Sequence, residues 1–204
     1  MFLRGFDYPW EALSKIKDFI YELSETLPED EYYSPKEGVW IHRSAKVFQS
    51  AFIAAPCIIG PETEVRHCAF IRGSALIGSD CVVGNSTELK NVILFDNVQV
   101  PHYNYVGDSV LGYRAHMGAG SITSNVKSDK KNVVVHFDDE NLETGIRKFG
   151  AMIGDNVEVG CGSVLNPGTV IGRSSNIYPL SSVRGTVSKN SIYKCRGEIA
   201  EKMD

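Results

Sequence analysis

The chain has 204 residues, of which 43% are apolar and 23% charged, as in an ordinary globular protein. Its net charge of −4 lacks the basic excess that binding to nucleic-acid phosphates requires. No apolar run is long enough for a membrane span or a signal peptide, and the five cysteines contain no CxxC pair. We therefore expect a reduced, cytoplasmic protein that binds neither nucleic acid nor membrane.

Residues 1–38 form the first expected segment, and they are acidic, with four Lys or Arg against nine Asp or Glu. From Pro9 to about Leu27, apolar residues recur at the spacing of one helix face. Pro9 suits the first turn of such a helix. We expect one amphipathic helix here, followed by an acidic linker over residues 29–37. Its apolar stripe should lie on the rest of the chain or on a neighbouring subunit.

From residue 39 onward, a period of six organises the chain. Large apolar residues occupy every sixth position from Ile41 to Phe95, and the register resumes at Tyr105 after a ten-residue step and at Ile153 after a longer gap. This period fits neither a helix nor a half-buried strand, but it fits a coil of three short strands whose large apolar residues, Phe95 and Tyr105 among them, fill the interior. The pattern predicts an all-β fold over residues 39–188, a parallel β-helix of six to seven coils. Hexapeptide prisms of this kind wind left-handed.

Residues 126–149 interrupt the period of six. They are rich in Lys and Asp and lack the apolar repeat. We expect them to form a loop or arm that is ejected from the prism. Residues 189–204 are expected to form a C-terminal tail.

A few residues stand out as candidates for chemistry. Arg72 and Lys90 are 18 residues apart, which is one coil, so they should stack on one outer face. Two neighbouring cations suit a phosphate monoester, although the spacing alone fits solvated surface charges better. His102 lies where the repeat breaks and could be a general base or, equally, a structural histidine. Cys57 and Cys81 occupy small-residue positions typical of packing. The histidine spacings indicate no metal site.

Five segments resemble the C-terminal acetyltransferase domain of the bifunctional glucosamine-1-phosphate acetyltransferase/N-acetylglucosamine-1-phosphate uridylyltransferases: FIRGSALIG, VGNSTELKN, PHYNYVGDSVLG, HMGAGSITSN and RKFGAMIGDNVEVG. The archaeal sugar-1-phosphate nucleotidylyltransferase variant, which also carries a lysine-containing arm, is the most similar. The resemblance covers about residues 41–187. Its motifs H-x-x-Y-x-G-D and G-A-G-[ST]-I-T-x-N are specific to this family among hexapeptide proteins.

The resemblance implies roles for individual residues. Arg72 and Lys90 match the pair that holds the sugar phosphate, and His102 matches the general base. The other matches are substrate contacts at Glu88, Tyr105, Asn125 and Lys131, and an acyl-donor contact at Ala119. The chain departs from the family at two positions: His116 stands in place of an asparagine, and Val126 in place of an aromatic residue.

The function that the resemblance implies is acetyl-CoA-dependent N-acetyl transfer to an amino-sugar 1-phosphate, glucosamine 1-phosphate first of all. It implies a homotrimer with sites between subunits and no metal for acyl transfer. We expect no nucleotidylyltransferase activity, because the relatives carry a nucleotide-binding domain before the prism where this chain has about 38 residues with one acidic helix. Basic residues near the C-terminus are candidates for the CoA phosphates: Arg173, Arg184, Lys189, Lys194 and Arg196. Two alternatives stay open, namely acyl transfer to another amino sugar or small amine, and a non-catalytic trimeric prism that serves as a binding or regulatory subunit.

Overall fold

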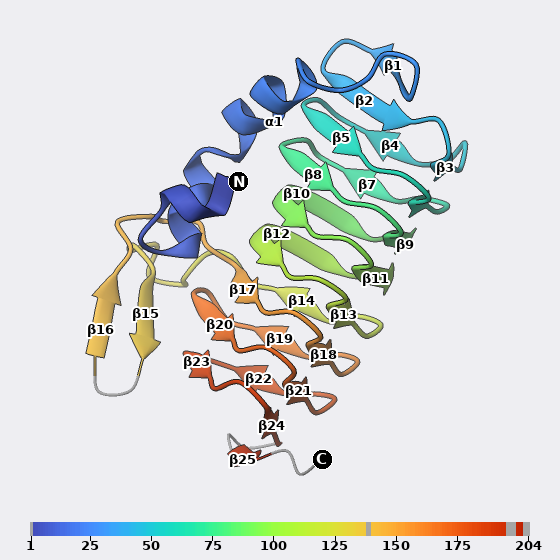
Figure 1. The fold of residues 1–204 in the computed structure, drawn as a ribbon. Helices are drawn as coiled ribbons and strands as arrows, with labels where there is room; N and C mark the ends of the chain where they lie inside the picture. The colour runs from blue at the N-terminus through green and yellow to red at the C-terminus, as the bar shows by residue number, and fades with distance from the viewer. Residues whose placement is uncertain (1, 138–139, 195–198, 202–204) are drawn as a thin grey trace.

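The computed structural model describes residues 2–137, 140–194 and 199–201. The body of the molecule is a left-handed parallel β-helix, a three-sided prism in which short strands stack coil upon coil (Figure 1). The expected fold class is therefore confirmed. We number the three sides of the prism as faces 1, 2 and 3.

Each face is a ladder of parallel strands. Face 1 contains β2 (Val39–His42), β5 (Cys57–Ile59), β8 (Ala75–Ile77), the ends of β10 (Glu88–Leu94) and β12 (Tyr105–Leu111), β17 (Ala151–Ile153), β20 (Thr169–Ile171) and β23 (Thr186–Val187). Face 2 contains β4 (Phe52–Ile53), β7 (Phe70–Ile71), the starts of β10 and β12, β14 (Ile122–Thr123), β19 (Val164–Leu165) and β22 (Ser182–Val183). Face 3 contains β3 (Lys46–Val47), β6 (Glu64–Val65), β9 (Val82–Asn85), β11 (Gln99–His102), β13 (His116–Met117), β18 (Glu158–Val159), β21 (Asn176–Ile177) and β24 (Ser191–Tyr193). The described residues thus form about eight coils, more than the six to seven expected.

The six-residue register slips at two sides of the prism. Interior positions continue from Leu89 as a buried series: Leu94, Val100, Val106, Leu111 and Met117. The steps into Leu94 and into Leu111 span five residues, and Glu88 accordingly pairs with Tyr105, 17 positions on. The expectation that Phe95 and Tyr105 fill the interior is wrong, because Phe95 is exposed and Tyr105 is only half-buried. Both have an apolar neighbour that takes the interior place.

The N-terminal segment covers face 1. It consists of two 3-10 turns, η1 (Phe2–Gly5) and η2 (Pro9–Ser14), and of α1 (Ile16–Ser24), so the single helix expected over 9–27 is divided at Lys15. At this break, the Leu13 carbonyl accepts a hydrogen bond from Asn91 Nδ2 on the prism at 3.1 Å. Ile16 and Ile20 are fully buried in an apolar layer that includes outward-facing residues of face 1: Ile58, Ile93, Val110 and Met152. No helix in the described part of the chain could span a membrane.

The remaining segments add strands at the ends and beside the prism. Strand β1 (Tyr32–Lys36) lies in the expected linker and pairs antiparallel with β2, and β25 (Ile199–Glu201) pairs antiparallel with β24. Residues 126–149 leave the prism as expected. They carry the hairpin β15 (Val134–Phe137) and β16 (Glu140–Glu143), and we call them the arm (Figure 1). The division of the chain into three segments at residues 38 and 188 stays a prediction.

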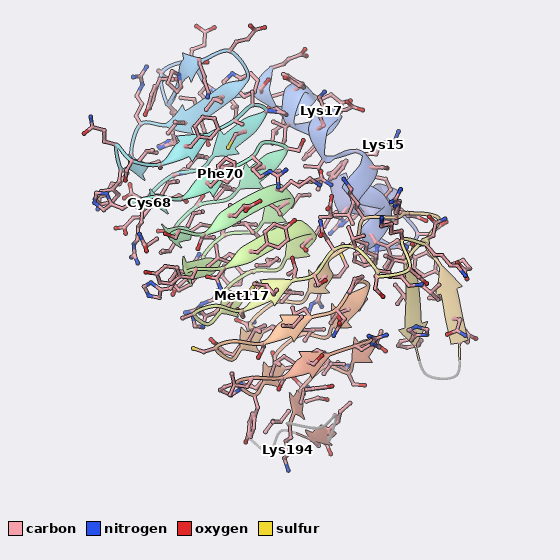
Figure 2. The ribbon with its side chains drawn as sticks, turned by 180° about the vertical axis from the view of Figure 1, so that it is seen from behind. Lys15, Lys17, Cys68, Phe70, Met117 and Lys194 are labelled. Atoms are coloured by element: carbon pink, nitrogen blue, oxygen red, sulfur yellow. The ribbon has the colours of Figure 1, made fainter. Side chains whose placement is uncertain are left out.

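Seen from behind, the helix marked by Lys15 and Lys17 lies along one edge of the prism, away from Phe70 and Met117 (Figure 2). Those two residues belong to strands of faces 2 and 3. The N-terminal segment and the base of the arm share one apolar layer with face 1, to which Trp10 and Phe149 contribute rings 5.9 Å apart. Faces 2 and 3 are therefore the sides on which a site can be open to solvent.

Candidate active site

A buried carboxylate organises one edge of face 2. The Asp108 side chain is 4% exposed, and both its oxygens lie 3.1 Å from Lys90 Nζ. Asn91 Nδ2 donates to Asp108 Oδ1 at 2.9 Å, and Asn125 Nδ2 donates to Oδ2. A charge buried in this way is stable only when donors and an opposite charge surround it. Asp108 therefore fixes the positions of Lys90 and Asn125.

The register slips create this arrangement. Each five-residue side of the prism contains a residue with positive φ, which is 53° at Asn91 and 47° at Asp108. Asn and Asp adopt this left-handed conformation more readily than other residues with a side chain. The tight turns point both side chains toward each other across stacked coils, 17 residues apart. Asp108 and Asn91 were missed by sequence reasoning, although Asp108 ends the H-x-x-Y-x-G-D motif.

An ion pair lies on the outer surface of face 2. Arg72 Nη1 is 2.8 Å from Glu88 Oε1, and this hydrogen bond raises the pKa of the Arg72 guanidinium. The Arg72 side chain is 44% exposed. The expectation of two adjacent unpaired cations is therefore modified, since Glu88 and Asp108 each neutralise one of them. The pair at Arg72 is open to water and exchangeable, whereas the pair at Lys90 is largely enclosed.

Tyr105 lies in register with Glu88 on the next coil. Burial raises the pKa of its phenol, and the negative charges of Asp108 and Glu88 raise it further. The phenol therefore stays neutral at physiological pH, although Arg72 and a side-chain hydrogen bond with Asn125 partly offset the rise in its pKa. A Cβ atom at Gly107 would lie 2.4 Å from the Tyr105 hydroxyl oxygen, so a side chain at position 107 would displace the phenol from this place.

His102 lies at the corner between faces 3 and 2. Its backbone N–H donates to Asn104 Oδ1 at 3.1 Å, and its carbonyl accepts from the N–H of Gly120 at 3.0 Å. Asn104 is buried, and its Nδ2 donates to the carbonyls of Gly118 and Ser121 at 2.8 and 3.1 Å. The exposed imidazole has no bonding partner among the described residues. The corner is thus held by its backbone and by Asn104, which sequence reasoning missed, and the ring is free to act.

Of two further expected site residues, Ala119 lies next to His102 and His116 lies away from the residues of face 2. Ala119 belongs to the corner that stacks beneath His102, as the bond from Gly120 shows. His116 lies on face 3, and its Nδ1 is 2.7 Å from Glu158 Oε2. A cavity of about 260 Å³ opens beside this pair, with Arg114 on its rim. Within one chain, His116 does not touch the residues of face 2.

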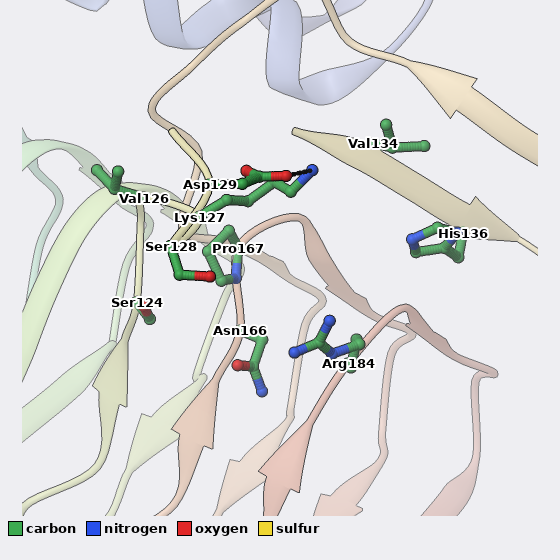
Figure 3. Close-up of a pocket in the computed structure, with 10 residues that line it drawn as sticks. All are labelled: Ser124, Val126, Lys127, Ser128, Asp129, Val134, His136, Asn166, Pro167 and Arg184. Carbon is green, nitrogen blue, oxygen red and sulfur yellow. Dashed lines mark ion pairs between the residues drawn. The ribbon is translucent and has the colours of Figure 1, made fainter. Parts of the chain in front are cut away.

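The arm carries Lys131, whose backbone N–H donates to Asp129 Oδ1 at 3.0 Å. No contact joins Lys131 to Arg72 or Lys90 in the described structure. Between the arm and the prism lies a cavity of about 430 Å³ (Figure 3). Lys127 and Asp129 form an ion pair of 3.4 Å on its arm side, and Arg184 lines it from the prism. Arg184 makes no hydrogen bond or ion pair with the residues described.

The other basic residues expected near the CoA phosphates are dispersed. Arg173 forms an ion pair of 3.0 Å with Asp155 on the outside of the prism. Lys189 is exposed, and Arg196 lies outside the described residues. No group of three metal-ligating side chains occurs in the described ranges. Two residues of this set line cavities: Arg184 lines the cavity between the arm and the prism, and Arg173 lines one of about 490 Å³ beside the N-terminal segment. Arg184 is the one of the two without an ion pair among the described residues.

The part of the chain that holds the site matches a family model. A family model described as the GMPPB C-terminal domain matches residues 53–171, which include His102, the expected substrate contacts and Ala119 but not the basic residues expected near the CoA phosphates. The chain belongs to this family. The match includes the coils with the shortened sides, the corner at His102 and the arm.

Curated relatives agree with the resemblance drawn from the motifs. The bifunctional protein GlmU of Methanococcus vannielii is 32% identical over 195 residues, 91% of this chain and 45% of the relative. GlmU of Methanococcus aeolicus is 37% identical over 114 residues, 56% of this chain and 28% of the relative. A bifunctional sugar-1-phosphate nucleotidylyltransferase/acetyltransferase of Sulfurisphaera tokodaii is 34% identical over 106 residues, 52% and 26% of the two chains. The chain spans less than half the length of these relatives.

A solved structure supports the fold. A hexapeptide transferase family protein from Anaplasma phagocytophilum matches with a TM-score of 0.54 at 15% identity, over 82% of each chain. At this identity the likeness extends to the fold alone. The family model and the curated relatives confirm the resemblance to the C-terminal GlmU domain, while the roles of single residues stay predictions.

Proposed function

We propose that this protein is an acetyl-CoA-dependent N-acetyltransferase whose acceptor is an amino-sugar 1-phosphate, glucosamine 1-phosphate first of all. The observation that carries the proposal is the unpartnered His102 imidazole at a corner next to face 2. That face presents Arg72, Lys90 and Tyr105 on successive coils. The relatives named GlmU and acetyltransferase support the reaction class.

The acceptor phosphate binds at Arg72 and Lys90. The carboxylate of Glu88 is exchangeable, so the phosphate replaces it at Arg72, and Glu88 becomes free to accept a hydrogen bond from a sugar hydroxyl. Lys90 stays anchored on Asp108 and offers its remaining N–H to the phosphate. Tyr105 and Asn125, already bonded to each other, contact the sugar. Binding energy from the phosphate thus holds the amine near His102.

The reaction is direct transfer without an acyl-enzyme. His102 accepts a proton from the amino group at C2 of the sugar, and the nitrogen attacks the thioester carbonyl. The C–N bond forms, a backbone N–H of a coil turn stabilises the oxyanion, and the C–S bond then breaks. The CoA sulfur leaves as a thiolate and takes the proton from His102. Ala119 lies beneath His102 where the thioester arrives, and Arg184 in the cavity binds phosphates of the donor.

The proposal is tested by following CoA release from acetyl-CoA with glucosamine 1-phosphate. His102→Ala should lower kcat by about two orders of magnitude or more, as expected for the loss of a general base. His67→Ala is the matched control, since His67 is a solvent-facing histidine at the same corner two coils above. Equal rates for wild type and His102→Ala would rule out His102 as the base. Absence of CoA release by the wild type would rule out this acceptor.

One observation favours a second acceptor. The family asparagine is replaced by His116, whose ring is bonded to Glu158. With Nδ1 donating to the carboxylate, a neutral imidazole presents its second nitrogen as a hydrogen-bond acceptor, whereas an asparagine amide offers both a donor and an acceptor, which changes the recognition of the sugar. Comparing amino sugars with and without the 1-phosphate separates the two acceptor classes. A preference for the acceptor without phosphate would replace glucosamine 1-phosphate by another amino sugar or small amine.

We further propose that the protein acts as a cytoplasmic homotrimer. His116 on face 3 and Lys131 on the arm do not reach the residues of face 2 within one chain, and a neighbouring copy would bring them there. Face 1 is covered by the chain itself, so faces 2 and 3 are the sides left for association. Sedimentation equilibrium should give three times the mass of the chain.

A further inference from the structure

Two phenylalanines lie exposed on face 2 directly above the ion pair. Phe52, Phe70, Glu88 and Tyr105 follow one another in register on successive coils. Phe52 and Phe70 are 56% and 42% exposed, and their ring centroids are 5.6 Å apart. Lys36 Nζ lies 5.1 Å from the Phe52 ring centroid. Two adjacent aromatic rings open to water, with a cation beside them, form a surface to which a flat ring can bind.

The groups along face 2 have a definite order, read from the coil of Tyr105 toward the N-terminal coils. Tyr105 and the His102 corner come first, and the amine reacts there. Lys90 and Arg72 follow on the next two coils, where the phosphate binds. Arg72 is two residues after Phe70 on the same side of the prism, and Phe52 lies one coil beyond, at a spacing of about 4.8 Å per coil. Anything attached to the acceptor phosphate on the side opposite the sugar therefore extends over Phe70 and Phe52.

We infer that the acceptor carries a nucleoside on its phosphate: face 2 binds a nucleoside diphosphate-linked amino sugar, with the base stacked on Phe70 and Phe52. This inference rests on the proposed function, because it uses the same acetyl transfer and extends the acceptor. Arg72 and Lys90 are separate cations on adjacent coils, so each takes one phosphate of a diphosphate. Lys36, beside Phe52, lies at the far end of the base.

Charge and chemistry favour this occupant over a purely apolar partner. The two rings are bordered by Lys36 on one side and by the Arg72–Glu88 ion pair on the other, so the apolar patch is small and has a cation at each end. A base offers a flat apolar face with a polar edge, and the attached diphosphate has two negative charges for the two cations. A second copy of this chain seated on the same patch is the competing occupant, and the experiment distinguishes the two.

The first measurement is isothermal titration calorimetry of the full chain with GDP, UDP and pyrophosphate. The diphosphates with a base should bind at least about tenfold more tightly than pyrophosphate, which is the range of one base stacked on an aromatic side chain. Phe70→Leu and Phe70→Ala should remove this difference and leave pyrophosphate binding unchanged. Phe137→Ala, an exposed phenylalanine on the arm with 51% exposure, is the matched control and should bind as wild type does.

The mass of each variant is determined by sedimentation in parallel. If Phe70→Leu or Phe70→Ala changes the oligomeric state and weakens all three ligands alike, the rings form a contact between subunits and the inference is overturned. Equal affinity of the wild type for GDP, UDP and pyrophosphate overturns it as well.

Turnover separates this inference from the proposed function. Suppose that the protein acetylates glucosamine 1-phosphate at least as fast as UDP-glucosamine and that GDP and UDP bind no more tightly than pyrophosphate. This result overturns the inference and leaves the proposed function standing. Base-dependent binding that requires Phe70, without acetylation of any acceptor, supports the nucleoside subsite and overturns the proposed function. A kcat/KM for UDP-glucosamine about tenfold above that for glucosamine 1-phosphate, lost in Phe70→Ala, supports both.

Discussion

Among single residues, Asp108 determines the geometry of face 2. Its buried carboxylate holds Lys90, Asn91 and Asn125 together. Asp108→Asn removes the negative charge and leaves Lys90 partly buried without its counter-ion. We expect the free energy of unfolding to fall by about 2–3 kcal/mol, the loss typical of a hydrogen-bonded charged group. Urea unfolding measures this, and kcat/KM for the acceptor should fall too, because Lys90 and Asn125 lose their common anchor.

Asp129→Asn is the matched control for this prediction. Asp129 pairs with Lys127 at the surface of the arm, 3.4 Å apart, where water screens the charges. The hydrogen bond from the Lys131 backbone N–H lowers the pKa of the Asp129 carboxyl, and this carboxyl is exposed to solvent. We expect an unfolding curve like that of the wild type. Equal destabilisation by both substitutions would contradict the anchoring role of Asp108.

At the scale of elements, α1 acts as a cover for face 1. Ile20 is fully buried in the apolar layer between α1 and the prism. Ile20→Ala leaves a cavity there, and we expect the free energy of unfolding to fall by about 2–4 kcal/mol. Lys17→Ala, on the exposed side of the same helix, should have little effect. Urea unfolding curves of the two variants with equal midpoints would show that α1 does not stabilise the prism.

The elements also show where prediction from sequence succeeds and where it ends. The period of six identifies the prism because each sixth residue from Ile41 to Leu89 fills the interior. It fails at the two five-residue sides, where Leu94 and Phe95 are both apolar and the pattern cannot choose between them. Arg72 and Lys90 are predictable from one coil of spacing. Asp108 is not, because a residue in a turn has no periodic signal until the register is known.

Contacts between distant segments are equally invisible in the sequence. The helix expected from Pro9 to Leu27 breaks where Asn91, 78 residues away, bonds to the Leu13 carbonyl. The pairing of Arg72 with Glu88 depends on side-chain rotamers at two coils. Such features follow from tertiary packing, so apolar periodicity alone cannot supply them.

For the whole molecule, the thiols inside the prism link stability to pH. Burial raises the pKa of the Cys57 and Cys81 thiols to about 12, from the ordinary value of 9.0 for a thiol. Above pH 9 the unfolded chain loses these protons while the folded chain keeps them, so stability falls as pH rises toward 12. The Cys57→Ala/Cys81→Ala variant should show a shallower decline in urea midpoint between pH 8 and 11. Alanine is a suitable replacement, because Ala75 occupies the position equivalent to Cys57 on the next coil. Parallel declines of the variant and the wild type would contradict the presence of protonated thiols in the interior.

The proposed assembly makes a prediction that one chain cannot fulfil. Lys131 lies on the arm and Arg72 on face 2, without contact in the described structure. If each site combines Arg72 of one subunit with Lys131 of the next, Arg72→Ala and Lys131→Ala proteins are each inactive as pure trimers. After unfolding and refolding together in equal amounts, about a quarter of the sites should hold both native residues, as cyclic symmetry requires. CoA release then recovers to that fraction of the wild-type rate. Refolding the same variants separately and mixing them afterwards is the control, and no recovery in the co-refolded sample would place both residues in one chain's site.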